Sequence, residues 1–215
     1  LLTGGFLVLG SGATQELCVI TATTSTTVSV KRGCLDTVPR SWPAGTKAWA
    51  LGRSSLVADG SEVLDGELLK YKMLPVTSVR RLELSEATER TFTPSDRLYL
   101  PLRPANIEVD STAGFSFSIT ATQTDMVVDW ANRNRVSETV HVHAWDDSTV
   151  VPETGQTTSV RLLDGAVVIA AHLGVAGETA TLDLSGASLT AGGALTLELC
   201  AERDGFSSWQ KAQFV

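Results

Sequence analysis

The chain has 215 residues, of which 43% are hydrophobic and 19% are charged, and its formal net charge at pH 7 is −7. This length and composition allow one large domain or two smaller ones with a buried core, and they argue against disorder. They also argue against unassisted binding to nucleic acid, because no surplus of positive charge is available to neutralise phosphates. Apolar runs stay shorter than the roughly 18 residues that a membrane-spanning helix needs.

Period-two alternation and β-branched residues dominate the first half, and helical periodicity is almost absent. Frequent Thr and closely spaced Gly favour short strands joined by tight turns. The apolar start, residues 1–10, lacks a basic segment, so we interpret it as a strand and not as a signal peptide. The predicted strands of this half are 6–9, 16–21, 26–31, 46–51, 67–74 and 79–84.

A proline-containing segment, 100–106, marks the clearest boundary in the chain. Pro101 and Pro104 cannot donate to a strand ladder and hold the backbone extended, which is typical of a semi-rigid linker. We therefore predict two domains. Residues 1–103 form a small barrel-like or irregular β domain, and residues 104–215 form a second β domain.

The second half predicts a β-sandwich of seven or eight short strands. Met126, Val128 and Trp130 would point inward from one strand, and Val127 and Asp129 outward. An Asp-Gly turn at Asp164 predicts a hairpin. The other apolar positions that mark strands are 107–109, 115–119, 140–144, 160–162, 167–171, 182–184, 195–201 and 209–215.

Several motifs of this half occur in the order of a fibronectin type III domain. They are Pro104-Ala105-Asn106, Trp130, the strand 195–201, Arg203-Asp204-Gly205-Phe206 and Ser208-Trp209. A Trp followed by Arg133-Asn134-Arg135, then Pro152-Glu153 and the closing Arg-Asp-Gly-x-x-Ser-Trp, resembles the C-terminal part of phage tail-tip (baseplate hub) proteins. The hub proteins of gene-transfer agents have a similar end.

The first half resembles the same proteins through separate motifs. Residues 27–39, with Arg32-Gly33 and Thr37, run into 42–49, which contains Ala44-Gly45-Thr46. Residues 72–77 and Arg97 before the proline linker continue the pattern. The resemblance therefore covers nearly the whole chain, and residues 138–151 fit it least well.

The resemblance implies structural work without catalysis. Such proteins are trimeric hubs or fibres that close the tail tube and lead towards host recognition. We therefore expect a virion protein of the tail tip, assembled in the host cytoplasm, that acts as a rigid all-β scaffold. Its expected partners are other phage tail proteins, identical copies around the tail axis and a host surface receptor, with no nucleic acid, no membrane-spanning segment and no cofactor.

The histidines and the cysteines have simpler interpretations than a metal site or a disulfide. His141 and His143 would lie on one face of a strand near Asp146 and Asp147, but a third fixed ligand is missing, so we favour a solvated polar face. His172 is interpreted as a partly buried histidine. The three cysteines are odd in number, so buried free thiols are favoured over a Cys18–Cys34 bridge, which stays open.

Catalytic constellations are not evident, and we expect no enzyme. Asp146 and Asp147 are adjacent, so on a strand they would point to opposite faces and serve one bond poorly. Asp129, Glu138 and Glu153 are scattered over predicted loops and edges. No nucleophile-elbow, zincin or phosphate-binding motif occurs.

The five tryptophans are the first structural or interface candidates. Trp130 is expected in the core, and Trp209 on the edge of the sandwich. Trp42 and Trp49 are expected in a core or a subunit interface, although they could stack on sugar rings. Trp145 is expected to be exposed and available to a partner.

Arg133 and Arg135 complete the candidate set. Their guanidinium groups could stack on Trp130 or Trp209, or form salt bridges with a neighbouring subunit. The main alternative function is an extracellular carbohydrate-binding or adhesion module, which needs exposed aromatic residues in a concave patch.

Overall fold

The computed structural model describes residues 3–11, 15–52, 63–96, 99–138, 142–189, 192–208 and 212–214. These residues form fifteen strands and one four-residue helix, α1 (Arg135–Glu138). All strand pairs are antiparallel, which confirms the all-β fold class. In the described part of the chain, no helix has the length and hydropathy needed to cross a membrane.

The chain forms two compact units. One combines Leu1–Val57 with Leu100–Val215, and the other is Ala58–Tyr99. The larger unit thus includes residues from both sides of the boundary placed between 103 and 104. That boundary stays a prediction about independently folding domains.

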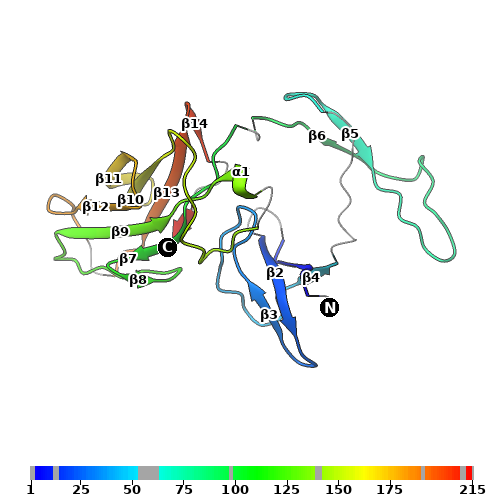
Figure 1. Cartoon of the computed structure of the whole chain (residues 1–215), viewed down its shortest axis with the longest axis horizontal. Coiled ribbons are helices and arrows are strands. Elements are labelled where there is room, and N and C mark those ends of the chain that lie inside the picture. The colour runs from blue at the N-terminus through cyan, green and yellow to red at the C-terminus, as the bar shows by residue number, and fades with distance from the viewer. Residues whose placement is uncertain are drawn as a thin grey trace. The chain divides into compact units, whose positions relative to one another are not determined.

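The N-terminal part of the larger unit is an open four-stranded sheet in the order β3-β2-β1-β4 (Figure 1). The strands are β1 (Phe6–Leu9), β2 (Glu16–Thr23), β3 (Val28–Lys31) and β4 (Ala48–Leu51). Of the two forms expected for this region, the described residues show the irregular one, because β3 and β4 lie at opposite edges and do not close a barrel.

The C-terminal part is a sandwich of two sheets (Figure 1). One sheet has the order β12-β9-β7-β8, with β7 (Ala105–Val109), β8 (Thr112–Ala113), β9 (Asp125–Ala131) and β12 (Thr179–Asp183). The other has the order β11-β10-β13-β14, and β15 also pairs with β13. Its strands are β10 (Thr157–Asp164), β11 (Val167–Val175), β13 (Leu195–Arg203), β14 (Phe206–Ser207) and β15 (Ala212–Phe214).

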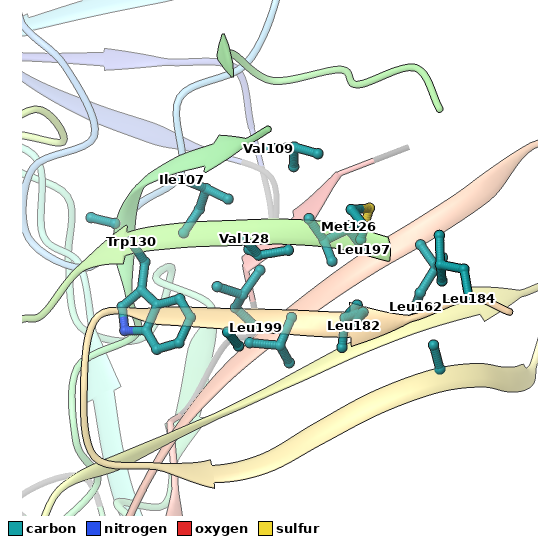
Figure 2. Close-up of a cluster of buried hydrophobic side chains, with 14 of the residues drawn as sticks. Ile107, Val109, Met126, Val128, Trp130, Leu162, Leu182, Leu184, Leu197 and Leu199 are labelled. Atoms are coloured by element: carbon teal, nitrogen blue, oxygen red, sulfur yellow. The ribbon is translucent and has the colours of Figure 1, made fainter. Parts of the chain in front are cut away.

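Alternation along β9 builds the core as predicted. Met126, Val128 and Trp130 are buried, whereas Val127 is exposed. They meet apolar side chains from the facing sheet, and Figure 2 shows this cluster. Each fully buried aliphatic side chain contributes about 1.5–3 kcal/mol relative to exposure, so the sandwich core is the main source of stability in this unit. Its largest fully buried members are Ile107, Met126, Leu182, Leu184, Leu199, Val128 and Val160.

The predicted Asp-Gly turn at Asp164 is present, and a second Asp-Gly turn lies at Asp204. Asp164 pairs with Val167 across the turn from β10 to β11, and Arg203 pairs with Phe206 across the turn from β13 to β14. Gly165 has a φ of 57°, a left-handed conformation that glycine adopts without steric cost.

Two predicted strands are wrong. Residues 115–119 form no strand, and Phe117 and Ile119 instead pack partly buried against the sandwich core. Residues 79–84 form only a single bridge, between Val76 and Arg81, around a turn. In both places side chains alternate in polarity, but the backbone lacks a neighbouring strand to complete a ladder.

Two other strand predictions have partial outcomes. In the predicted strand 140–144, residues 140 and 141 lie outside the described part, and residues 142–144 are not in a strand. The sequence did not predict β6 (Glu89–Phe92), which pairs with β5 (Leu69–Lys72). Apolar residues alternate only weakly along β6, so its own sequence does not predict a strand. Pairing with β5 gives it its extended conformation.

We expect Leu182→Ala to lower the free energy of unfolding by about 2–5 kcal/mol, because Leu182 is fully buried between the two sheets. The matched control is Leu173→Ala, since Leu173 is 59% exposed on β11 and its truncation should cost less than about 1 kcal/mol. Urea denaturation followed by circular dichroism measures both. Equal losses would contradict this assignment of the core.

Candidate functional site

The predicted site residues do not gather into one cleft. Trp130 is buried in the sandwich core, as expected. Trp49 lies on β4 and is 58% exposed, whereas Trp42 is half-buried in the segment before β4. Trp209 lies outside the described residues.

The expectation that Trp145 is exposed is wrong. Its side chain is only 8% exposed and packs against Phe115, with ring centroids 6.2 Å apart and the rings tilted by 56°. A Cβ at Gly33, which has a φ of 57°, would come within 2.9 Å of the Trp145 side chain. The backbone N–H of Trp145 donates to the carbonyl of Arg32 at 2.8 Å. Residues far away in sequence therefore bury this ring.

Arg133 braces the segment that follows α1. Its guanidinium group is buried and donates to four backbone carbonyls. Nη1 lies 2.8 Å from the oxygens of Asn132 and Asp147, and Nη2 lies 2.6 Å and 2.9 Å from those of Ala144 and Trp145. Hydrogen bonds from a charged donor are about twice as strong as neutral ones. One side chain thus holds the irregular turn 144–147 against the end of β9.

Arg135 and Arg203 meet on the buried carboxylate of Glu153. One oxygen of Glu153 accepts from the backbone N–H of Arg135 at 3.2 Å, and the other accepts from Arg135 Nε at 2.9 Å. The second oxygen also accepts from Arg203 Nη1. Arg203 is at the end of β13, so this triad ties α1, which follows β9 of one sheet, to β13 of the other sheet. The sequence had placed Glu153 on a loop or edge without a role.

Three motifs of the tail-tip resemblance therefore converge in space. Arg133 and Arg135 come from the Arg-x-Arg motif, Glu153 from Pro-Glu, and Arg203 from Arg-Asp-Gly. They form what we call the bracing network: the Arg133 carbonyl contacts and the Arg135–Glu153–Arg203 triad. A cation–π pair lies elsewhere, with the Arg32 guanidinium carbon 5.8 Å from the Phe115 ring centroid.

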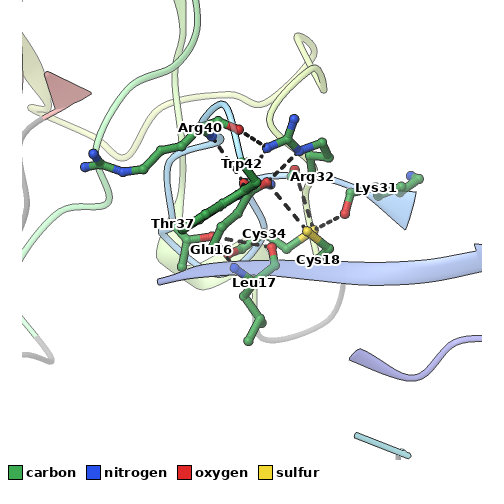
Figure 3. A network of polar contacts seen from close by, with 10 residues as sticks. Glu16, Leu17, Cys18, Lys31, Arg32, Cys34, Thr37, Arg40 and Trp42 are labelled. Carbon is green, nitrogen blue, oxygen red and sulfur yellow. Dashed lines mark hydrogen bonds and ion pairs between the residues drawn. The ribbon is translucent and has the colours of Figure 1, made fainter. Parts of the chain in front are cut away.

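A second buried carboxylate, Glu16, organises the N-terminal sheet (Figure 3). Its side chain is fully buried and pairs with Arg32, whose Nε and Nη2 lie 2.8 Å and 2.5 Å from the two carboxylate oxygens. The backbone N–H groups of Gly33 and Arg40 donate to it at 3.2 Å, and Trp42 Nε1 donates at 2.7 Å. Glu16 thereby fixes the whole loop that follows β3.

The surroundings of Glu16 favour its charged form. Burial by itself would raise the pKa of this carboxyl, but the hydrogen bonds from Arg32 and Trp42 outweigh it, so the pKa lies below its usual value. Sequence reasoning missed Glu16. The signal was present, because Glu16, Cys18 and Ile20 alternate on one face of β2 and all three are buried.

Trp42 is held as part of this cluster. Besides donating to Glu16, its ring lies over Gly10, where an added Cβ would collide with it. Gly10 has a φ of 75°, so glycine is favoured there both by conformation and by space. Trp42 is therefore committed to packing, and Trp49 is the exposed aromatic residue of the pair.

The remaining polar candidates are dispersed. His143 lies 3.1 Å from Ser137 Oγ and 3.6 Å from the carboxylate of Asp147, and His141 lies outside the described residues. Asp147 also accepts from the backbone N–H of Ala144 at 2.9 Å. His172 is exposed, contrary to expectation. Within the described ranges, no group of three His, Cys, Asp or Glu side chains is placed to hold a metal ion.

A cavity of about 280 Å³ opens at one end of the sandwich. The side chains of Val109, Met126, Leu162 and Leu197 form its floor, and the segment 117–121 forms a wall. Its described lining contains no titratable side chain, so it could hold an apolar group but offers no acid or base.

All three cysteines are free and buried. Burial and the neighbouring carboxylate of Glu16 raise the pKa of the Cys18 thiol to about 12. The thiol contacts Glu16 at 3.5 Å, which disfavours the thiolate further. Cys18 is therefore inert as a nucleophile in the folded chain.

No family model matches the chain, and no curated protein matches it.

We expect Glu16→Gln to lower the free energy of unfolding at pH 7 by about 1–3 kcal/mol, because Arg32 loses its charged acceptor. The pKa of Glu16 is lowered on folding, so its contribution is present above the unfolded-state pKa and is lost as the pH falls through the folded-state pKa. The gap between wild type and variant should therefore shrink below about pH 4. Denaturation over a pH series measures it, with the exposed Asp146→Asn as control. A gap independent of pH would refute the charge-based explanation.

We expect no thiol to react with a disulfide reagent in the native chain at pH 8, and three to react in denaturant. At that pH a thiol with a pKa of about 12 is thiolate in only about one molecule in ten thousand. Spectrophotometric titration of the released thiolate counts the groups. One reactive thiol in denaturant, instead of three, would reveal a bridge between two of the cysteines.

Proposed function

We propose that this chain is a structural component of a phage tail tip or baseplate, where it acts as a rigid β scaffold. It belongs, in this proposal, to the virion and is assembled in the host cytoplasm. Its partners are other tail proteins and identical copies arranged as a trimer around the tail axis, with a host surface receptor beyond them. The proposal extends to the absence of a catalytic role.

The bracing network is the observation that carries the proposal. The charged residues on which the tail-tip resemblance depends hold backbone segments in place. Arg133 donates to four carbonyls, and Glu153 joins Arg135 of α1 to Arg203 at the end of β13. Such contacts lock irregular connections that the sheets alone would leave loose, as a load-transmitting module requires.

The Glu16 cluster supports the same function in the other half of the larger unit. It fixes a loop through an ion pair and three N–H donors. The residues involved include Arg32 and Gly33, which belong to the first-half motif of the resemblance. The motifs of both halves of the chain thus hold irregular backbone segments in place.

A carbohydrate-binding or adhesion module is the second candidate, favoured by one observation. Trp49 is 58% exposed on an edge strand and could stack on a sugar ring. The other two aromatic residues considered for such a patch, Trp42 and Trp145, are engaged in packing. Glycan-array binding that is lost in Trp49→Ala would favour this candidate.

The proposed function is tested by locating the chain in phage particles. We expect immunogold electron microscopy of virions from the phage that encodes it to label the tail end distal to the capsid. We also expect Arg133→Met to reduce the fraction of complete tails at least about tenfold, because it leaves buried carbonyls without donors. Ser148→Ala, an exposed position in the same segment, serves as control. Label away from tails, or full tail assembly without the chain, would refute the proposal.

A further inference from the structure

The cavity at one end of the sandwich has a floor made entirely of core side chains. Val109, Met126, Leu162 and Leu197 line it, and none of them is more than 4% exposed. They come from β7, β9, β10 and β13, so both sheets contribute, and their side chains are shown in Figure 2. A molecule that enters the cavity therefore meets the apolar interior of the sandwich directly.

The mouth of the cavity carries small and hydroxyl-bearing residues. Phe117 and Ile119 pack partly buried on the core, whereas Ser118 and Thr120, which alternate with them, are exposed and line the same cavity. Gly192 adds no side chain, and a Cβ built on it would meet nothing within 4 Å. An apolar interior with a few neutral polar groups at the opening is typical of small-molecule sites.

The volume limits the size of the molecule that can enter. The cavity measures about 280 Å³. An apolar cavity of about 150 Å³ holds a benzene ring, so about ten non-hydrogen atoms fit here. The floor is aliphatic, and burial against it is non-directional, which suits a flexible aliphatic chain that follows its surface.

The cavity lies in a part of the chain without cations. Apart from Leu162, its described lining comes from residues 104–132 and 176–200, and these two stretches contain no Lys or Arg. Arg161, the neighbour of Leu162, points to the other face of β10 and pairs with Glu198 at 3.3 Å. An anionic ligand would therefore find no counter-charge in the described lining.

Two carboxylates strengthen this selection against anions. Asp110 directly follows one floor residue, and Asp125 directly precedes another. Both are exposed, and the Gln123 amide joins them by donating to the Asp110 carboxylate and to the Asp125 carbonyl, each at 2.8 Å. Burying an unpaired charge beside them would be costly, so the electrostatic surroundings favour an uncharged ligand.

We propose that this cavity binds the aliphatic chain of an uncharged amphiphile of about ten non-hydrogen atoms, with its polar end at the hydroxyl groups of Ser118 and Thr120. Apolar burial supplies the affinity, at about fourfold for each CH₂ group. The inference goes beyond the proposed function and does not depend on it, because a chain that is no part of a tail would still bind.

The two methionines of the chain form a pair of reporters for this site. Met126 lies in the floor and is 2% exposed, whereas Met73 belongs to the smaller unit and is 72% exposed. We expect octan-1-ol to shift the ¹³C-methyl NMR signal of Met126 until one molecule is bound per chain, and to leave that of Met73 unchanged. Met73→Leu assigns the signals.

Two results of this titration would overturn the proposal. Equal shifts of both methionine signals would mean unspecific adsorption to exposed apolar surface. A Met126 signal that stays unshifted up to the solubility limit of octan-1-ol would mean that the cavity admits no chain.

Head-group charge and chain length test the class of ligand. At pH 8 we expect octanoate to bind at least about tenfold more weakly than octan-1-ol, because its carboxylate meets no cation. Hexan-1-ol, shorter by two CH₂ groups, should bind about fifteenfold more weakly. Octanoate that binds as tightly as octan-1-ol, or hexan-1-ol that binds equally well, would contradict the assignment.

A matched pair of tryptophan variants tests the position of the site. Ala194 is exposed and lines the cavity, so Ala194→Trp should obstruct it and raise the dissociation constant of octan-1-ol at least about tenfold. Ala171→Trp, exposed on β11 and outside the described lining, should leave it within about twofold. Circular dichroism checks folding, and Ala121→Trp replaces the first variant if that does not fold. Normal binding by a folded, obstructed variant would refute the site.

Discussion

Backbone groups in irregular segments must find hydrogen-bond partners, and this constraint explains the burial of Glu16 and Arg133. A buried N–H or C=O without a partner costs about 1–3 kcal/mol. Glu16 accepts from N–H groups of the loop after β3, and Arg133 donates to carbonyls of the turn after α1. Each charge is itself neutralised or solvated by these contacts, which makes its burial tolerable.

The core and the braces have complementary roles. Packing between the two sheets of the sandwich supplies most of the stabilisation, but apolar contacts do not specify how a long connection runs. The connection between β9 and β10 contains only the four residues of α1 as regular structure among its described residues. Directional contacts from Arg133 and Glu153 fix its path. An apolar core that supplies stability, together with charged contacts that fix the connections, fits a mechanical scaffold whose function depends on a fixed geometry.

The two units differ in how their apolar residues are used. In the larger one, alternating residues such as Val128 and Leu199 are buried against the facing sheet. In the smaller one, the apolar side chains of β5 and β6 lie on a face with no layer above it among the described residues of that unit. Strand pairing alone therefore does not bury apolar side chains, because burial depends on whether a second layer is present.

The sequence by itself determined the all-β class, the sandwich in the second half, the inward face of β9 and the Asp-Gly turns. These depend on period-two alternation and turn chemistry, which are properties of neighbouring residues. Only the tertiary structure decided that Trp145 is buried, that residues 115–119 cover the core without joining a sheet, and that Glu16 and Glu153 hold their arginines. Trp145 meets Gly33 and Phe115, and Glu153 meets Arg203, across long stretches of chain. Such meetings follow from the packing of whole elements, which no local pattern encodes.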